Sequence, residues 1–350
     1  MLTVGAALLF LLTGLFALLG TYLVRGLALR AGIVSHPNPI VPQHTRPVAY
    51  LGGVGIVLGV VTGLSVLLAL RAWGQVSFPG DLWPGWCVLV PGVLFLVLGT
   101  ADDLLPLSAG GKFAFQAALA ILAATLGLTH SFTGIRMLDA GISCFWILLL
   151  VNAFNLTDVC DGLVAGLALI IFLALSWLDG GMTLLGVAAA GACAGFLWLN
   201  LPPASIFLGD AGSHLLGFLA AALTLSVRGR TVWPYAAQML VILGIPLFEL
   251  IFLIAMRNRK GLPWWKGSAD HFSLRLQKAG LSKLHTDLIA WAACIVLCGA
   301  AMAIGVAPRW LQIVILAGIS GGFAVFWRLL LNWDVGERPT SAEGELSPNR

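Results

Sequence analysis

The sequence predicts an all-α integral membrane protein, and three observations lead to that class. Of the 350 residues, 59% are hydrophobic and only 10% are charged. Fifteen acids and nineteen bases are too few to cover the surface of a water-soluble domain of this length. The apolar residues form continuous runs that do not alternate with polar ones, which favours membrane helices over a membrane β-barrel.

Eleven apolar runs come close to the length of about 20 residues that a helix needs to cross the hydrocarbon. The first run has no basic segment before it and no small-residue cleavage site after it, so we expect it to be retained as a helix. The expected spans are 3–24, 51–71, 85–100, 113–130, 139–154, 162–178, 182–200, 213–227, 235–256, 286–307 and 310–331.

The lysines and arginines of the loops indicate the orientation of these spans. If the N-terminus lies outside, fourteen of the nineteen basic residues fall on the cytoplasmic side. We therefore expect a cytoplasmic C-terminus and a protein of the inner (cytoplasmic) membrane. Residues 1–331 would form one polytopic catalytic domain, and 332–350 a polar, disordered cytoplasmic tail. In this topology every polar-rich loop faces the cytoplasm.

Five carboxylates lie where apolar spans begin or end, all in expected cytoplasmic loops. A charge at mid-bilayer costs about 3 kcal/mol, so we place them near the membrane surface. A single aspartate there is commonly a helix cap. Five together repel one another unless a proton or cation joins them, and oxygen ligands with open positions suit Mg²⁺ bound to substrate phosphates. The five are Asp102, Asp103, Asp158, Asp161 and Asp210.

Four polar stretches occur in one order along the chain: ADDLLPLSAGGKFAFQ (101–116), NAFNLTDVCDGL (152–163), FLGDAGSHLLGF (207–218) and DHFSLRLQKAGLS (270–282). Together they resemble the polyprenyl-phosphate N-acetylhexosamine-1-phosphate transferases of glycosyltransferase family 4. The resemblance covers residues 1–330. It implies an integral membrane enzyme that moves a sugar 1-phosphate from a UDP-sugar onto a polyprenyl phosphate such as undecaprenyl phosphate, with Mg²⁺ or Mn²⁺ as cofactor.

The resemblance assigns catalytic and metal roles by position. Asp102 and Asp103 match a paired-aspartate motif, in which Asp102 would deprotonate or orient the acceptor phosphate. Asp210 would hold the metal, with Asp158 at the metal and nucleotide edge. His271 matches the first histidine of an H-x-H-H-like motif and joins the catalytic group. A direct transfer and a two-step route through an aspartyl-phosphate both remain open.

The resemblance also assigns substrate-binding residues. Lys112 would hold phosphate, and Phe207 occupies the position of an aromatic residue that stacks on uracil. Asn155 and Asp161 would line the nucleotide side of the cleft. His44 belongs to an N-terminal loop that matches at Pro37, Asn38, His44, Pro47, Gly52 and Gly53.

Several positions depart from the family pattern. Ser35 stands where an aspartate is expected, and the basic pair of the N-terminal loop is missing. Ser273 and Leu274 replace further histidines, which argues against the phospho-MurNAc-pentapeptide branch and favours UDP-GlcNAc or a similar UDP-HexNAc as donor. Glu249, deep in a span, stands where an aspartate is common, and we expect it either to pair helices or to shape the site.

The expected partners are the UDP-sugar, the polyprenyl phosphate and the lipid bilayer, with no nucleic acid. Small-xxx-small spacings at 53–59 and 191–195 fit a homodimer as readily as packing within one chain. The rival interpretations are a transporter and a non-catalytic lipid-binding relative. A transporter would carry its acids near mid-membrane on broken helices in repeated halves, and we see no such repeat.

Overall fold

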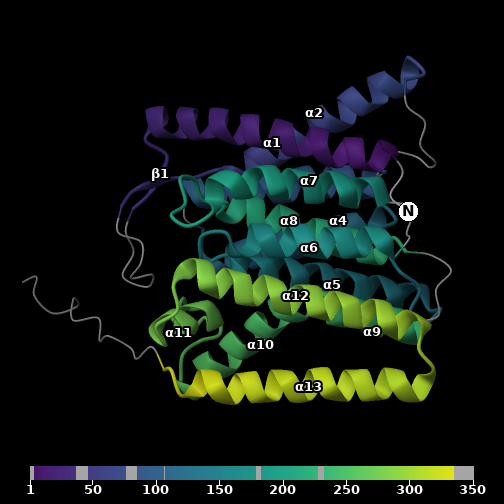
Figure 1. Cartoon of the computed structure of the whole chain (residues 1–350), viewed down its shortest axis with the longest axis vertical. Helices are drawn as coiled ribbons and strands as arrows, with labels where there is room; N and C mark the ends of the chain where they lie inside the picture. Colours follow the sequence, from purple (N-terminus) through teal and green to yellow (C-terminus); the bar gives the residue numbers. More distant parts are fainter. Residues whose placement is uncertain are drawn as a thin grey trace, which may run out of the picture.

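The computed structural model describes residues 4–36, 46–75, 85–105, 107–178, 183–227 and 232–334. Long helices lie side by side and form most of the molecule (Figure 1). The helices in the described part of the chain are α1 (Val4–Ala31), α2 (Gly52–Ala72), α3 (Trp86–Leu104), α4 (Ala109–Thr125), α5 (Arg136–Thr157), α6 (Leu163–Trp177), α7 (Thr183–Asn200), α8 (Gly209–Leu225), α9 (Val232–Ile242), α10 (Gly244–Arg259), α11 (Phe272–Lys278), α12 (Lys283–Val306) and α13 (Arg309–Leu331).

Each of the eleven expected spans coincides with helix, so the mostly helical architecture with several membrane spans is confirmed. Seven helices are individually long and apolar enough to cross a membrane, or eight if the bent pair α9 and α10 counts as one span. Helices α4, α6 and α8 have 15 to 17 residues and are shorter than that test requires. The number of eleven spans and their orientation therefore remain predictions.

One expected span, 235–256, is two helices. Helices α9 and α10 meet at Leu243 and are bent by 71°. Pro246 lies in the first turn of α10, where its missing N–H leaves the carbonyl of Ile242 without its helical partner. Gly244 and Pro246 thus end one helix and start the next, while the run of apolar residues continues through the bend.

Small residues bring the N-terminal helices close together. A Cβ at Gly59 in α2 would collide with Ala17 of α1, and a Cβ at Gly195 in α7 would collide with the carbonyl oxygen of Gly14 in α1. The small-xxx-small spacings noted in the sequence are therefore used for packing within the chain. The homodimer remains a prediction.

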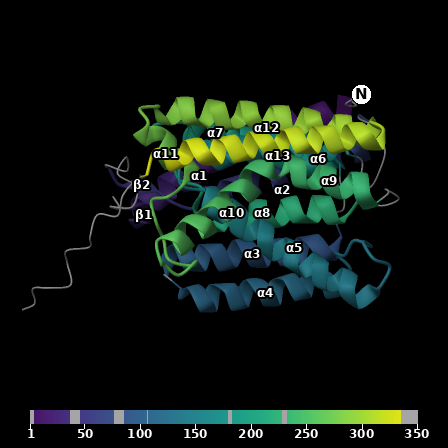
Figure 2. The same ribbon diagram turned by 90° about the horizontal axis from the view of Figure 1, so that it is seen from below.

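The polar connections gather at one end of the bundle, opposite the N-terminus. Figures 1 and 2 place the short strands, α11 and the last turn of α13 together at this end. Strands β1 (Val34–Ser35) and β2 (Val48–Ala49) pair antiparallel, and Ala49 also forms a parallel bridge with Ile206 before α8. This ties the N-terminal segment to the segment that carries Phe207.

Candidate active site

The two neighbouring aspartates at the end of α3 have different partners. Asp103 Oδ1 accepts the backbone N–H of Asp210 at 2.8 Å, and its Oδ2 accepts that of Ala211 at 3.1 Å. These amides belong to the first turn of α8, where N–H groups lack partners within the helix. Asp103 therefore caps α8 from another helix, and both of its oxygens are occupied.

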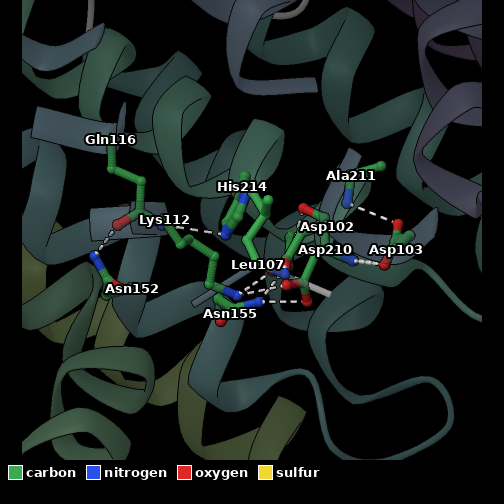
Figure 3. Close-up of polar contacts among 11 residues, drawn as sticks. Asp102, Asp103, Leu107, Lys112, Gln116, Asn152, Asn155, Asp210, Ala211 and His214 are labelled. Atoms are coloured by element: carbon green, nitrogen blue, oxygen red, sulfur yellow. Dashed lines mark hydrogen bonds and ion pairs between the residues drawn. The ribbon is translucent and has the colours of Figure 1, made fainter. Parts of the chain in front are cut away.

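Asp102 faces helix α4. Its Oδ1 accepts the backbone N–H of Leu107 at 2.8 Å, and its Oδ2 lies 2.6 Å from Lys112 Nζ. Helix α4 begins after Ser108, whose side chain accepts the N–H of Gly111, and this start places Lys112 in the first turn. Lys112 Nζ also lies 2.6 Å from Asp210 Oδ2, so one ammonium group bridges two carboxylates (Figure 3).

Asp210 connects the three central motifs. Asn155, near the end of α5, donates its Nδ2 to Asp210 Oδ1 at 2.8 Å and to Ser213 Oγ at 3.0 Å. Asp210 itself stands in the first turn of α8, where the helix dipole favours a negative charge. Residues of the 101–116, 152–163 and 207–218 segments thus contact one another at Asp210.

Asp158 directly follows α5. Burial, and then the charges of Asp210, Asp103 and Asp161, raise the pKa of the Asp158 carboxyl well above its usual range. A bound divalent cation would relieve that repulsion, so Asp158 and Asp210 fit a metal by their chemistry. In the described part of the chain, however, no group of three or more His, Cys, Asp or Glu side chains could hold a metal. The donor set therefore suits an ion that takes its other ligands from substrate phosphates.

Asp161 is used to hold the loop between α5 and α6. Its Oδ2 accepts from Lys283 Nζ at 2.8 Å and from the backbone N–H of Ala204 at 3.2 Å. The N–H of the next residue, Gly162, donates to Asn200 Oδ1 at 2.9 Å. The loop is thus fixed to the α7–α8 connection and to the start of α12, and Lys283 had not been singled out from the sequence.

The segment before α8 carries Phe207 against the N-terminal segment. The ring of Phe207 meets the ring of Tyr50 edge to face, with centroids 6.1 Å apart. Burial raises the pKa of the Tyr50 phenol, a hydrogen bond from Ser35 lowers it, and the charges of Asp103, Asp210 and Asp158 raise it further. Phe207 and Tyr50 therefore lie beside the carboxylates. His44 lies outside the described residues, as do Pro37 and Asn38.

His271 pairs with the other residue that the sequence marked inside the membrane region. Its Nδ1 lies 2.7 Å from Glu249 Oε1, and Glu249 Oε2 accepts the backbone N–H of Phe272 at 3.2 Å. Glu249 is fully buried in α10 and His271 is nearly so. The carboxylate thus fixes both the imidazole and the start of α11. The structure thus pairs His271 with Glu249. The carboxylates of Asp102 and Asp210 have Lys112 as their partner.

Charged residues hold the rest of α11 in place. Arg275, almost fully buried, donates to Asp270 at 2.5 Å, to Asp334 at 3.1 Å and to the carbonyl oxygen of Leu330 at 2.9 Å. Lys260 Nζ donates to the same two aspartates. The end of α10, helix α11 and the end of α13 are therefore tied into one unit around the His271 segment.

A group of amide and imidazole side chains lies about one helical turn further along the helices from the charged cluster. The sequence analysis did not identify it. Asn152 Nδ2 donates to Gln116 Oε1 at 2.9 Å, and Gln116 Nε2 lies 3.2 Å from His214 Nε2 (Figure 3). Because an amide NH₂ can only donate, His214 Nε2 accepts and the neutral ring carries its proton on Nδ1.

Helical spacing could have found this group. Gln116 follows Lys112 by four residues, as His214 follows Asp210 and Asn152 precedes Asn155 by three. Residues with this spacing lie on the same face of a helix. A polar residue one turn away from a site residue is therefore expected to face the same neighbouring helices.

Two apolar cavities lie elsewhere, on either side of α13. One of about 550 Å³ is bordered by α9, α10 and α13, and one of about 450 Å³ by α10, α11, α12 and α13. Phe248 and Phe323 border both. Neither lining contains a carboxylate, so we place the chemistry at the Asp102–Lys112–Asp210 cluster.

Comparison with known proteins gives a consistent result. The model of glycosyl transferase family 4 matches residues 85–228, which hold Asp102 through Asp210. A probable undecaprenyl-phosphate N-acetylglucosaminyl 1-phosphate transferase of Bacillus subtilis is 30% identical over 322 residues, covering 88% of this chain and 87% of the relative. A decaprenyl-phosphate N-acetylglucosaminephosphotransferase of Mycobacterium tuberculosis is 32% identical over 350 residues, covering 88% and 86%.

A third relative is more distant. The undecaprenyl-phosphate alpha-N-acetylglucosaminyl 1-phosphate transferase of Escherichia coli K12 is 26% identical over 329 residues, covering 86% of this chain and 85% of the relative. The likeness thus extends over nearly the whole length of each relative. Identities of 30% and 32% over most of both proteins establish that this chain belongs to glycosyl transferase family 4, with the polyprenyl-phosphate N-acetylhexosamine-1-phosphate transferases.

Proposed function

We propose that this protein transfers N-acetylglucosamine 1-phosphate from UDP-GlcNAc to undecaprenyl phosphate, releasing UMP and forming the lipid-diphospho-sugar that starts an envelope polysaccharide. The observation that carries the proposal is the ammonium group of Lys112 held at 2.6 Å from both Asp102 and Asp210. A positioned cation between two carboxylates, at helix ends that share one end of the bundle, suits the transfer of a phosphoryl group.

The residues divide the reaction among them. An oxygen of the polyprenyl phosphate attacks the phosphorus next to the sugar, and the bond from that phosphorus to UMP breaks with its electron pair. Asp102 Oδ2, which faces the Lys112 ammonium group, takes the acceptor's proton, whereas Asp103 caps the start of α8 with both of its oxygens. Lys112 neutralises charge that builds up on the phosphate oxygens, and Asn155 keeps Asp210 in place.

We further propose that Asp210 and Asp158 hold Mg²⁺, with Mn²⁺ as a substitute. When bound, the ion would neutralise the diphosphate of the donor. The support is that burial, and then the charges of Asp210, Asp103 and Asp161, raise the pKa of Asp158 well above its usual range. The protein supplies two carboxylates, and the substrate phosphates complete the shell.

The acceptor can approach Lys112 along an apolar surface. Phe113, directly after Lys112, is exposed, and its ring meets the exposed ring of Trp264 edge to face with centroids 6.2 Å apart. Arg257 holds this loop by donating to the carbonyl oxygen of Trp264 at 2.6 Å. Aromatic rings at a membrane surface beside a cation suit a lipid phosphate, whose chain stays in the bilayer.

The membrane arrangement follows from the same assignment. We propose eleven spans, with α9 and α10 forming one bent span, the N-terminus outside and the active site on the cytoplasmic face of the inner membrane. The support is that the connections carrying the motifs share one end of the bundle with α11 (Figure 1). The basic residues of the loops are concentrated at that same end of the expected spans.

The preference for UDP-GlcNAc over the pentapeptide donor is inferred from the segment that contains His271. Ser273 and Leu274 are buried beside His271 in α11, where the phospho-MurNAc-pentapeptide branch carries consecutive histidines. A single imidazole fixed by Glu249 favours a smaller donor such as UDP-GlcNAc or a related UDP-HexNAc.

The test is to identify the product. The full chain in detergent is incubated with Mg²⁺, undecaprenyl phosphate and, in separate reactions, UDP-GlcNAc, UDP-GalNAc and UDP-MurNAc-pentapeptide. We expect a lipid-diphospho-GlcNAc, detected by mass spectrometry, together with equimolar UMP. Product from the pentapeptide donor alone would reassign the branch, and a folded protein that makes no product with any donor would contradict the proposed reaction.

A further inference from the structure

The helix that carries Lys112 has a narrow buried face. The structure describes every residue of α4, and the buried ones are Gln116, Ala120 and Ala123. Helix α4 packs on α3 and α5, and two alanine side chains offer few atoms to fix its position along its axis. Directional hydrogen bonds of a buried polar side chain can fix it. Gln116, fully buried one turn after Lys112, is that side chain.

The amide of Gln116 joins α4 to two other helices. Its Oε1 accepts from Asn152 Nδ2 of α5 at 2.9 Å, and its Nε2 donates to His214 Nε2 of α8 at 3.2 Å (Figure 3). Asn152 also donates to the carbonyl oxygen of Leu148 at 2.8 Å, which fixes its own amide. The hydrogen bonds therefore run in one direction, from Asn152 through Gln116 to the neutral ring of His214.

The contact between Gln116 and His214 lies beside the ion pair of the charged cluster. Gln116 follows Lys112 by four residues on α4, and His214 follows Asp210 by four residues on α8. The two pairs thus join the same two helices about one turn apart. Because Lys112 Nζ lies 2.6 Å from both Asp102 and Asp210, a small movement of α4 would lengthen at least one of these contacts.

We propose that Gln116 is a positioning residue of the transfer reaction: by holding α4 to α8 and to α5, it keeps the Lys112 ammonium group between its two carboxylates. This inference rests on the proposed function, because it gives Lys112 a part in the phosphoryl transfer. Gln116 is fully buried, so it acts through Lys112 and not by contact with a substrate.

The experiment removes the hydrogen bonds in the full chain in detergent. Gln116→Leu removes both bonds at similar side-chain size, and His214→Met removes the acceptor. His214→Gln returns an acceptor oxygen near the place of Nε2. Gln238→Leu is the matched control, because Gln238 is a buried glutamine of α9 that donates to the carbonyl oxygen of Ala301 in α12 at 3.0 Å. Neither of those helices carries a residue of the charged cluster.

Turnover separates positioning from general support of the fold. We expect Gln116→Leu and His214→Met to lower kcat about 10- to 100-fold, with smaller changes in the KM of either substrate, because misplacement by about 1 Å can cost that much. His214→Gln should recover most of the loss. Gln238→Leu should keep kcat although it also loses a buried hydrogen bond. In a Lys112→Met background, Gln116→Leu should lower kcat less than about twofold.

The position of Lys112 can also be measured without turnover. An ammonium group between two carboxylates holds its proton, so it reacts slowly with acetic anhydride. The acetylation rate of Lys112 is compared by mass spectrometry with that of the exposed Lys266. We expect Gln116→Leu and His214→Met to raise this ratio several times, and Gln238→Leu to leave it unchanged.

Other results would overturn the inference. Wild-type kcat in Gln116→Leu, or an unchanged acetylation ratio, would show that Gln116 does not position Lys112. Equal fold losses with and without Lys112 would show that Gln116 only stabilises the helices. If Gln116→Leu does not fold, His214→Met and its recovery in His214→Gln decide in the same way. A wild-type protein that makes no lipid product would refute the proposed function, whereas the acetylation ratios would still test the position of Lys112.

Discussion

Replacing Asp103 by alanine should destabilise the folded protein more than replacing its neighbour Asp102. Asp103 accepts two backbone N–H groups at the start of α8, and hydrogen bonds to charged groups contribute about 1.5 to 3 kcal/mol each. Partial access of solvent lowers the sum, so we expect a loss of about 3 kcal/mol. Asp102→Ala removes one backbone hydrogen bond and the ion pair with Lys112, which stays paired with Asp210; because the backbone contact is exposed and water can replace it, a loss of about 1 kcal/mol is expected.

Thermal unfolding of the two variants in the same detergent tests this difference. A loss of 3 kcal/mol lowers the midpoint by about 5 °C or more on the scale of soluble domains, and a loss of 1 kcal/mol by about 2 °C. Asp102→Ala should lose turnover while it keeps most of its stability. Equal midpoints for the two variants, or a larger fall for Asp102→Ala, would refute the separation of roles within the pair.

Three further predictions concern the neighbouring groups. Lys112→Met should lower kcat about 100-fold or more with the fold intact, because Lys112 supplies the positive charge between the two carboxylates; a loss confined to KM would restrict Lys112 to binding. His271→Ala should lower turnover strongly, and Glu249→Gln combined with it should add little, because the pair acts as a unit; additive losses would separate them. The raised pKa of Asp158 means that the folded protein without metal binds a proton more tightly than the unfolded chain. Stability should therefore fall as pH rises from about 4 through the raised pKa, and Asp158→Asn should remove that slope; an unchanged slope would contradict the burial of this carboxyl.

The membrane helices could be predicted from the sequence because each expected span is a long apolar run, whereas the short helix α11, with the sequence FSLRLQK, has no such run and was not predicted. The bend between α9 and α10 could not be predicted from apolarity, since Gly244 and Pro246 are themselves compatible with a membrane span. Their spacing contains the signal: a proline three residues after the break has no N–H for the carbonyl of Ile242. The strand pair depends on contacts between segments far apart in the chain.

The meeting of Asp102, Asn155 and Asp210 could also be predicted, because the sequence places their motifs at helix ends that are expected on one side of the membrane. The difference between Asp102 and Asp103 could not, because the amides that Asp103 caps lie 107 and 108 residues further along the chain.

The contact partners of several other side chains also could not be predicted from the sequence. Glu249 and His271 were each marked, but their contact requires the particular way in which α11 folds back against α10. Asp161 was expected at the nucleotide, whereas its visible partners are Lys283 and a backbone amide.

The measurement that tests the central claim most directly is UMP release by the wild type and by Asp210→Asn, at equal amounts of folded protein. Each is supplied with UDP-GlcNAc, with and without undecaprenyl phosphate and Mg²⁺. We expect UMP from the wild type only when lipid and Mg²⁺ are both present, and none above background from Asp210→Asn. Release without the lipid, or near-normal release by Asp210→Asn, would contradict the assignment of the Asp102–Lys112–Asp210 cluster as the site of transfer.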